Sequence, residues 1–276
     1  MSAGTLGIIA GSGDLPRRLI AACRAQGRAC FVLALQDQTD AATVQDVPHS
    51  WNRLGAAQEA LDALHGAGVV EIVLAGHMKR PSLTSLKPDV KGAAMLARIG
   101  LRAFGDDSIL RALKSELERE GFRIVGPDSI LSSLLAGSGP FGTHRPDEAA
   151  QADIARGIEV ARALGSVDVG QAVVVQQGIV LGVEAVEGTD ALLQRVEHLR
   201  REGPRGVLVK LAKPAQDRRM DLPTIGPETV RRAEQAGLAG IAVESGGTLI
   251  LDRDEMVRLA DAAGLFVLGL EPPGSA

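Results

Sequence analysis

The sequence is poor in cysteine, with only 2 among its 276 residues. Cys23 falls in a predicted helix and Cys30 opens a predicted strand, a placement typical of reduced core residues in a cytosolic protein. We therefore expect both thiols to be free and the protein to be cytoplasmic.

Long apolar runs and an excess of basic charge are also missing. No window reaches the roughly 18 to 20 apolar residues that would span a bilayer, and the start MSAGTLGIIAGSG lacks a basic segment followed by a long apolar stretch. The formal net charge of -4 offers no broad basic field to nucleic acid phosphates, and Lys and Arg are scattered. These absences argue against export, membrane insertion and nucleic acid as a partner.

The chain does have enough apolar material for two ordinary cores. Hydrophobic residues make up 45% and charged residues 23%, the composition of a soluble globular protein without a disorder signature. A length of 276 residues suits two domains of ~130 residues each. At residues 137–148, GSGPFGTHRPDE, apolar periodicity gives way to Gly, Pro, Ser and charge. We therefore predict domains at residues 1–136 and 149–276, joined by a linker at 137–148.

The first half alternates short apolar runs with amphipathic stretches, from Leu6 to about Ala136. This alternation is typical of an α/β domain in which helices cover a mostly parallel sheet. The predicted strands are LGIIA, CFVLAL, VVEIVLA and FRIVG, and the predicted helices are LPRRLIAACRAQG, AAQEALDALHGAG and DDSILRALKSELEREGF.

The second half predicts another α/β domain, with a mixed sheet. A helix is expected over DEAAQADIARGIEVARALG, followed by a hairpin around Gln177–Gly178 in QAVVVQQGIVLGVEAVEG. Further strands are predicted at GVLVKLA, GIAVE, TLILD and LFVLGL, interleaved with helices near residues 190–201, 227–236 and 254–263.

The first segment with chemical potential is GIIAGSGDLP, a strand followed by a glycine turn and a helix that Pro16 can begin. Gly11 and Gly13 would let the backbone approach a phosphate, which the helix N-terminus attracts. Pro16 occupies the place of the third glycine of a dinucleotide fingerprint. That departure, and the lack of residues matched to hydride transfer, weigh against an NAD(P)-dependent oxidoreductase. A tight turn without a ligand is the other alternative.

The segment GHMKRPSL, residues 76–83, follows the strand VVEIVLA and so falls at the carboxyl edge of the predicted sheet. Open α/β sheets bind ligands at that edge. Lys79 and Arg80 are candidates for contacting phosphate there. The alternative is a solvated pair of cations before Pro81.

The strongest candidate segment is KLAKPAQDRRMDLPTIGPET, residues 210–229, between a predicted strand and a helix. Ordered polar loops at sheet edges often carry function. Carboxylates beside cations suit metal-assisted phosphoryl transfer, because they offer oxygen ligands to Mg²⁺ and positive charge to phosphate. A salt-bridged surface loop is the alternative. The polar residues concerned are Lys210, Lys213, Gln216, Asp217, Arg218, Arg219, Asp221 and Thr224.

A second group of acids lies in GVEAVEGTDALL, between a predicted strand and a helix. Its polar residues are Glu184, Glu187, Thr189 and Asp190, and Gln171 opens the preceding strand. Thr189 or Asp190 would serve as a helix cap in one interpretation. In the other interpretation the acids are a further source of metal ligands.

Six motifs follow one another along nearly the whole chain: GSGDLP, MKRPS, DDSILRALKSELEREGF, DVGQAVVVQQG, EAVEGTD and KPAQDRRMDLPTIGP. Together they closely resemble the UDP-2,3-diacylglucosamine pyrophosphatases of the LpxI type, enzymes of lipid A biosynthesis in Gram-negative bacteria. The resemblance implies Mg²⁺-dependent hydrolysis of UDP-2,3-diacylglucosamine to UMP and 2,3-diacylglucosamine 1-phosphate, with water attacking the sugar-side phosphorus. It also implies an N-terminal Rossmann-like domain, a C-terminal domain of its own type, and a lipid held between them.

The resemblance further assigns roles to particular residues. Asp221 matches the aspartate of the RxDLPTIG pattern and is expected to be the essential carboxylate, with Asp217, Glu187 and Asp190 as further metal ligands or water-positioning groups. Lys210, Lys213 and Arg219 are expected to hold phosphate in the catalytic group. The expected substrate-binding residues are Gly11, Ser12, Gly13, Asp14, Leu15, Lys79, Gln171, Thr189, Gln216 and Thr224.

The expected partner is a UDP-linked, diacylated glucosamine lipid. Its acyl chains require an apolar slot, and because the lipid resides in a membrane we expect transient attachment of the enzyme to the inner-membrane surface. No lipidation motif or basic amphipathic helix accounts for that attachment. Homodimer formation is left open, as is a non-enzymatic carrier or sensor that binds the lipid without cleaving it.

Overall fold

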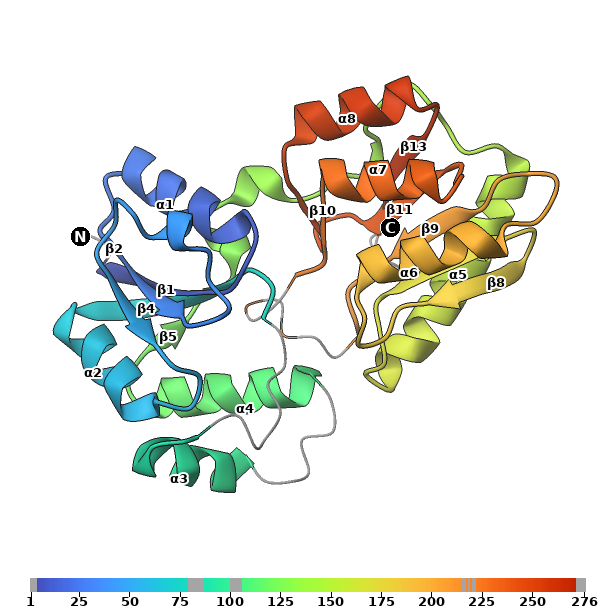
Figure 1. The fold of residues 1–276 in the computed structure, drawn as a ribbon. Coiled ribbons are helices and arrows are strands. Elements are labelled where there is room, and N and C mark those ends of the chain that lie inside the picture. The colour runs from blue at the N-terminus through green and yellow to red at the C-terminus, as the bar shows by residue number, and fades with distance from the viewer. Residues whose placement is uncertain are drawn as a thin grey trace. The chain divides into compact units, whose positions relative to one another are not determined.

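The computed structural model divides the chain into two compact units, which are shown in Figure 1. It describes residues 4–78, 87–99, 106–214, 217, 219 and 222–271. The first unit comprises Met1–Ser132 with Asp217–Asp221, and the second comprises Ser133–Gln216 with Leu222–Ala276. Each unit has its own sheet and its own core, so each is described in turn.

The first unit is built on a five-stranded parallel sheet in the order β3-β2-β1-β4-β5. This confirms the predicted α/β class with a parallel sheet. One strand was not predicted from the sequence, because its residues, HSWN, lack an apolar run. The strands are β1 (Thr5–Ala10), β2 (Cys30–Leu35), β3 (His49–Asn52), β4 (Val69–Ala75) and β5 (Arg123–Ile124).

The helices of this unit are α1 (Leu15–Ala25), α2 (Ala57–Gly66), α3 (Val90–Ile99) and α4 (Asp106–Arg119). In α1 the apolar residues Leu19, Ile20 and Cys23 recur at helical spacing and are buried, as the sequence predicts. The structure also describes short 3-10 helices in both units: η1 (Ala41–Thr43), η2 (Pro127–Ser129), η3 (Ser132–Leu134) and η4 (Glu197–Leu199).

An acid is buried in the first sheet among apolar neighbours. Glu71 of β4 is only 8% exposed. It forms ion pairs with Arg28, on the segment before β2, and with Arg123 of β5. These cations balance the charge that burial would otherwise make costly.

The second unit contains a six-stranded mixed sheet in the order β6-β13-β11-β9-β7-β8. Strands β9, β11 and β13 are parallel, whereas β7 runs antiparallel to β8 and β9, and β6 runs antiparallel to β13. The predicted mixed sheet is thus confirmed. Its strands are β6 (Gly139–Pro140), β7 (Ala172–Gln176), β8 (Ile179–Val183), β9 (Val207–Lys210), β11 (Gly240–Glu244) and β13 (Phe266–Leu270); β10 (Thr224–Ile225) and β12 (Leu249–Ile250) form a separate parallel pair.

Helices cover both faces of the second sheet, as Figure 1 shows. In β7, Val173 and Val175 pack toward the long helix α5 (Glu148–Ser166), while Val174 belongs to the core on the opposite face. That opposite core is closed by α6 (Thr189–Val196), α7 (Pro227–Gln235) and α8 (Arg253–Ala262). A strand buried on both faces explains the unbroken apolar run AVVV.

The β7–β8 hairpin turn forms where the sequence predicts it. Gln177 and Gly178 adopt left-handed backbone angles, with φ of 55° and 74°. The carboxylate of Asp153 on α5, only 1% exposed, accepts hydrogen bonds from the Gln177 N–H at 3.0 Å and the Gly178 N–H at 2.7 Å. A buried acid therefore fixes this turn to the helix that packs on the sheet.

The segment in which the sequence predicts a linker contains β6, which pairs with β13. Farther along this segment Asp147 caps α5 by accepting the Ala150 N–H at 2.8 Å. Within the described part of the chain, no helix has the length and apolar character needed to cross a membrane.

Candidate functional site

In the first unit, the loops that follow β1 and β4 leave neighbouring strands at the carboxyl edge of the sheet. The chain order reverses between these two strands, which is where open α/β sheets bind ligands. The Ser12 N–H donates to the His77 carbonyl at 2.9 Å, and the His77 N–H donates to the Ser12 carbonyl at 3.0 Å. The glycine turn and the segment Gly76–Met78 are therefore joined into one surface.

Two glycines allow this close approach. A Cβ atom on Gly11 would lie 2.4 Å from the His77 carbonyl oxygen, and one on Gly76 would lie 2.4 Å from the Ser12 carbonyl oxygen. Gly76 also has a φ of 90°, which favours glycine. Gly13, with a φ of 91°, points its N–H toward Asp40 at 3.3 Å.

Within the described part of the chain, no side chain caps the start of α1. Asp14 occupies the N-cap position but makes no capping hydrogen bond, and instead pairs with Arg17. No acidic residue lies in the first helical turn, which Leu15 begins. An uncapped helix N-terminus beside a glycine turn can bind a phosphate group.

In the second unit, Lys210 is a buried cation at the carboxyl end of β9. It is 7% exposed, and its Nζ donates to the Thr224 carbonyl at 3.0 Å. It forms no ion pair with any acid that the structure describes. A buried ammonium group without a carboxylate is costly, so Lys210 is a candidate for binding an anion.

The hydrogen bond from Lys210 places Thr224 beside it. The sequence analysis put both residues in one polar segment, 210–229. The Thr224 hydroxyl donates to the Leu222 carbonyl at 3.2 Å. The backbone of β10 is thus held between its own turn and the Lys210 ammonium.

Lys213 has an acidic partner that the sequence analysis did not identify. Its Nζ lies 2.6 Å from Oδ1 of Asp168, and both side chains are largely buried. The pair ties the loop after β9 to the segment before β7, so part of the Lys213 charge serves to position that loop.

A second polar group gathers at the amino end of β7, next to Lys210. Lys210 pairs with Ala172 in the sheet, and the Leu211 N–H donates to the Gln171 carbonyl at 2.9 Å. The Gln171 N–H in turn donates to Glu184 at 3.3 Å. Two segments that the sequence marked separately therefore lie side by side.

Glu184 is the centre of this group. The residue is only 6% exposed, and its carboxylate accepts the Thr189 hydroxyl at 2.8 Å. The Gln171 Oε1 is buried, and none of the described residues forms a hydrogen bond with it. An unsatisfied buried acceptor of this kind is costly and suggests a donor that arrives from a ligand or water.

The helix-cap interpretation of Thr189 and Asp190 is wrong. The N-cap of α6 is Gly188, with a φ of 82°, and no side chain that the structure describes caps this helix. Thr189 is the first helical residue and Asp190 the second. The glycine conformation at Gly188 supplies the sharp entry that a side-chain cap would otherwise help to fix.

Glu187 is engaged by a cation of its own unit. Its Oε1 accepts Arg195 at 2.8 Å, and its Oε2 accepts the Ala185 N–H at 3.2 Å. As a metal ligand it would have to exchange these partners.

Asp217, which belongs to the first unit, is bound by two cations. Arg219 donates to it through Nε at 2.9 Å and Nη2 at 2.8 Å, and the Lys114 ammonium of α4 lies 2.5 Å away. The Arg219 guanidinium, followed by Lys114, holds the pKa of Asp217 well below its usual range. Lys114 is a further member of this cluster that sequence spacing did not reveal.

Several candidate site residues lie outside the described residues: Lys79, Arg80, Gln216, Arg218 and Asp221. Of the four acids expected to bind Mg²⁺, the structure therefore places Asp217, Glu187 and Asp190 only. Among the residues it places, no three His, Cys, Asp or Glu side chains form a metal-binding group. The roles expected for these residues remain predictions.

The sequence matches two family models: LpxI N-terminal domain over residues 5–134, and LpxI C-terminal domain over residues 137–268. It is 41% identical over 274 residues to a Caulobacter vibrioides protein named UDP-2,3-diacylglucosamine pyrophosphatase LpxI, covering 97% of this chain and 98% of that protein. Among solved structures, UDP-glucose 4-epimerase of Thermus thermophilus in complex with NAD has 11% identity and a TM-score of 0.32, covering 99% of this chain and 88% of that one. This last likeness is too distant to support a conclusion about fold or ligand.

Proposed function

The chain belongs to the LpxI family, and from this premise we propose that it hydrolyses the pyrophosphate of UDP-2,3-diacylglucosamine to UMP and 2,3-diacylglucosamine 1-phosphate in lipid A biosynthesis. The observation that carries the proposal is the 41% identity to the Caulobacter vibrioides protein of that name across 97% of this chain. Identity that extends through both units supports the same substrate more strongly than a match to one unit would.

The first unit is proposed to bind the nucleotide side of the substrate. The turn Gly11–Gly13 and the uncapped start of α1 present backbone N–H groups at the reversal point of the parallel sheet. Such groups suit the negative charge of the uridine diphosphate moiety. Lys79 would add a cation next to Met78, whose neighbour His77 is already joined to Ser12.

Lys210 is proposed to hold a phosphate oxygen of the substrate. The Lys210 ammonium has three N–H groups, one of which donates to the Thr224 carbonyl. Since no described acid pairs with it, we propose that its other N–H groups hold the ligand. A phosphate would supply the opposite charge that buried Lys210 lacks among the described acids. Lys213 and Arg219 would contribute further positive charge to the phosphates or to the carboxylates beside them.

Asp221 is proposed as the essential carboxylate that orients the attacking water. The water oxygen bonds to the sugar-side phosphorus, the bond from that phosphorus to the bridging oxygen breaks, and UMP leaves with the bridging oxygen. The reaction adds one water and changes no oxidation state, so it requires no redox partner. Glu184 and Thr189 would steady the amino end of β7 beside Lys210, a positioning role.

Mg²⁺ is proposed as the cofactor, held by Asp221 with Asp217. Carboxylate oxygens are the donors that Mg²⁺ prefers, and one or two are enough where substrate phosphates and water fill the remaining positions. When bound, the ion neutralises charge that develops on the diphosphate. Asp217 is ionised, as a ligand must be, but it would have to loosen its bonds to Arg219 and Lys114.

The test is incubation of the purified chain with UDP-2,3-diacylglucosamine, with Mg²⁺ or with a chelator, followed by detection of UMP. We expect UMP only with the metal ion, and a loss of at least about 10²-fold in rate for Asp221→Ala. Asp254→Ala, which removes an exposed acid from the first turn of α8, is the matched control and should keep wild-type turnover. Tight binding of the lipid without UMP release would instead identify a carrier.

A further inference from the structure

Three arginines lie on one exposed loop of the second unit, before β9. They are Arg200, Arg201 and Arg205. Together with Leu199 they form the arginine loop. Two hollows share Arg205. One, of about 390 Å³, is lined by Arg200, Arg201 and Gly237, and the other, of about 250 Å³, by Arg205, Asp147 and Gly264.

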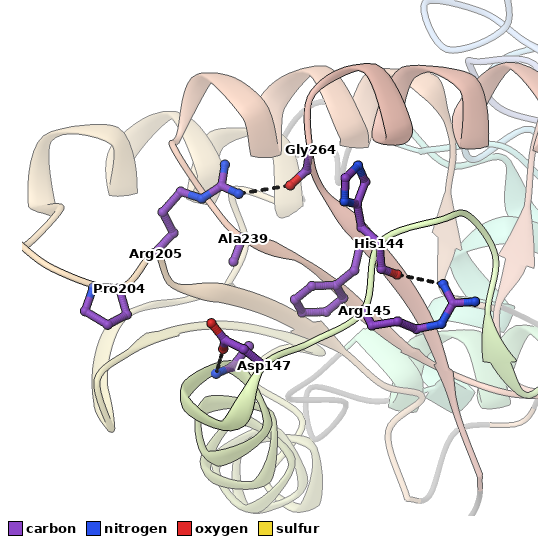
Figure 2. Close-up of a pocket in the computed structure, with 9 residues that line it drawn as sticks. His144, Arg145, Asp147, Pro204, Arg205, Ala239 and Gly264 are labelled. Carbon is purple, nitrogen blue, oxygen red and sulfur yellow. Dashed lines mark hydrogen bonds between the residues drawn. The ribbon is translucent and has the colours of Figure 1, made fainter.

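Figure 2 shows the smaller hollow, with Arg205 reaching across it to Gly264 and Asp147 on its opposite wall. Arg145 also lines this hollow, but its side chain turns away from Arg205 in this view. Arg205, Gly237 and Gly264, which line the two hollows, lie shortly before the parallel strands β9, β11 and β13. They therefore occupy the amino edge of the sheet, whereas Lys210 stands at its carboxyl edge.

The backbone of the arginine loop is held by the side-chain amides of two glutamines, one buried and one exposed. Gln176, only 3% exposed, donates through Nε2 to the carbonyls of Arg201 and Pro204, both at 2.8 Å. Gln177 donates through Nε2 to the Glu202 carbonyl at 2.6 Å. The loop is thus held in place while its charged side chains stay exposed.

The positive charges of the arginine loop are not neutralised within the described structure. Arg205 donates to the Gly264 carbonyl at 2.9 Å and Arg200 to the Glu197 carbonyl at 3.2 Å. Neither they nor Arg201 forms an ion pair with a described acid. By contrast, Arg258 of α8 is paired with Glu255 at 2.7 Å. The loop therefore offers guanidinium groups that can bind an external anion.

Apolar side chains are exposed beside these charges. Leu199 is 46% exposed and precedes Arg200. Ile179, at the hairpin turn to which the loop is bonded, is 45% exposed. Arginine next to exposed aliphatic side chains is the composition of a surface that meets both the head groups and the acyl boundary of a bilayer.

We propose that the arginine loop docks the protein on an anionic bilayer, with its guanidinium groups bound to lipid phosphates. The inference rests on the proposed function in one respect, that a substrate with two acyl chains resides in a membrane. The guanidinium group matches phosphate geometry and carries a permanent charge. Because the whole chain has a net charge of -4, the attraction has to be local to this loop.

The test is co-sedimentation of the full chain with vesicles that contain no substrate. Phosphatidylcholine vesicles are compared with vesicles in which about one third of the lipid is phosphatidylglycerol. We expect the wild-type chain to bind the anionic vesicles and to be released as salt rises. The double variant Arg200→Glu with Arg201→Glu should bind them at least about tenfold more weakly.

The matched control is Arg162→Glu with Arg258→Glu, which changes the net charge equally. Arg162 is exposed on α5 and Arg258 on α8. Equal loss in the two double variants, or equal binding to neutral and anionic vesicles, would overturn the proposal, as would wild-type protein that stays in solution. Far-UV circular dichroism verifies that both variants are folded. Since no substrate is present, the outcome is independent of whether the chain hydrolyses the UDP lipid.

Discussion

The phosphate sites proposed for the two units are built in different ways. In the first, backbone N–H groups of a glycine turn and a helix start face the reversal point of a parallel sheet. In the second, the candidate groups are buried side chains, Lys210 and Glu184, at one edge of a mixed sheet. A backbone site depends on local conformation, whereas a side-chain site depends on which strands are neighbours.

The largest effect that this comparison predicts is on Lys210. Lys210→Met should lower kcat/KM for the UDP lipid by about 10²- to 10³-fold, because the phosphate loses its buried cation. Stability should be unchanged or slightly higher, since an ammonium group no longer has to be desolvated. Steady-state kinetics and urea unfolding measure the two effects. A variant that unfolds easily would instead make Lys210 a structural residue.

Replacing a buried acid in the first unit should lower the stability of the fold, in contrast to the replacement of Lys210. Glu71→Ala removes the carboxylate between Arg28 and Arg123, and should lower the free energy of unfolding by about 2–3 kcal/mol, because Arg28 is left largely buried without its partner. Urea denaturation is the measurement. Glu159→Ala, which breaks an exposed pair with Arg156, should cost at most about 1 kcal/mol.

The backbone site can be tested at Gly76. Gly76→Ala should cost about 2 kcal/mol of unfolding free energy, because alanine is strained at a φ of 90° and its Cβ would meet the Ser12 carbonyl oxygen. Gly66→Ala at the end of α2 should not destabilise the protein, because no described atom lies within 4 Å of the added Cβ. Thermal unfolding of both variants decides the matter, and equal midpoints would contradict the role assigned to Gly76.

The smallest expected effect is chemical and concerns the two thiols. A hydrogen bond from Cys23, together with Arg24 and Arg28, lowers the pKa of Cys30 to about 7, whereas the same contact raises the pKa of Cys23. Cys30 should therefore react with iodoacetamide with a midpoint near pH 7, while buried Cys23 stays unmodified in the native protein. Peptide mass spectrometry across a pH series would reveal any reversal of this order.

The fold was largely predictable because the strands β1, β2 and β4 are apolar runs between turns. Strand β3 was not predicted, because HSWN has no such pattern. Strand β6 was not predicted either, because its two residues, Gly139–Pro140, are too few to show a periodicity. Pairing with a neighbour, which local sequence does not encode, makes both of them strands.

The candidate site was predictable only in part. Its residues Lys210 and Thr224 are 14 positions apart in one polar loop, and the structure joins them. Of the two cations bonded to Asp217, Lys114 is 103 positions away in the sequence, and no spacing rule could identify it. Asp168 was likewise found only when the fold brought it to Lys213.

The Asp153 carboxylate, which holds the β7–β8 turn, also affects the position of the arginine loop. Gln176 and Gln177, beside that turn, carry the backbone of the arginine loop through their amide groups. The proposed contact of that loop with a bilayer would therefore depend on a buried carboxylate of α5. A change at Asp153 would displace the arginine loop without replacing any of its guanidinium groups.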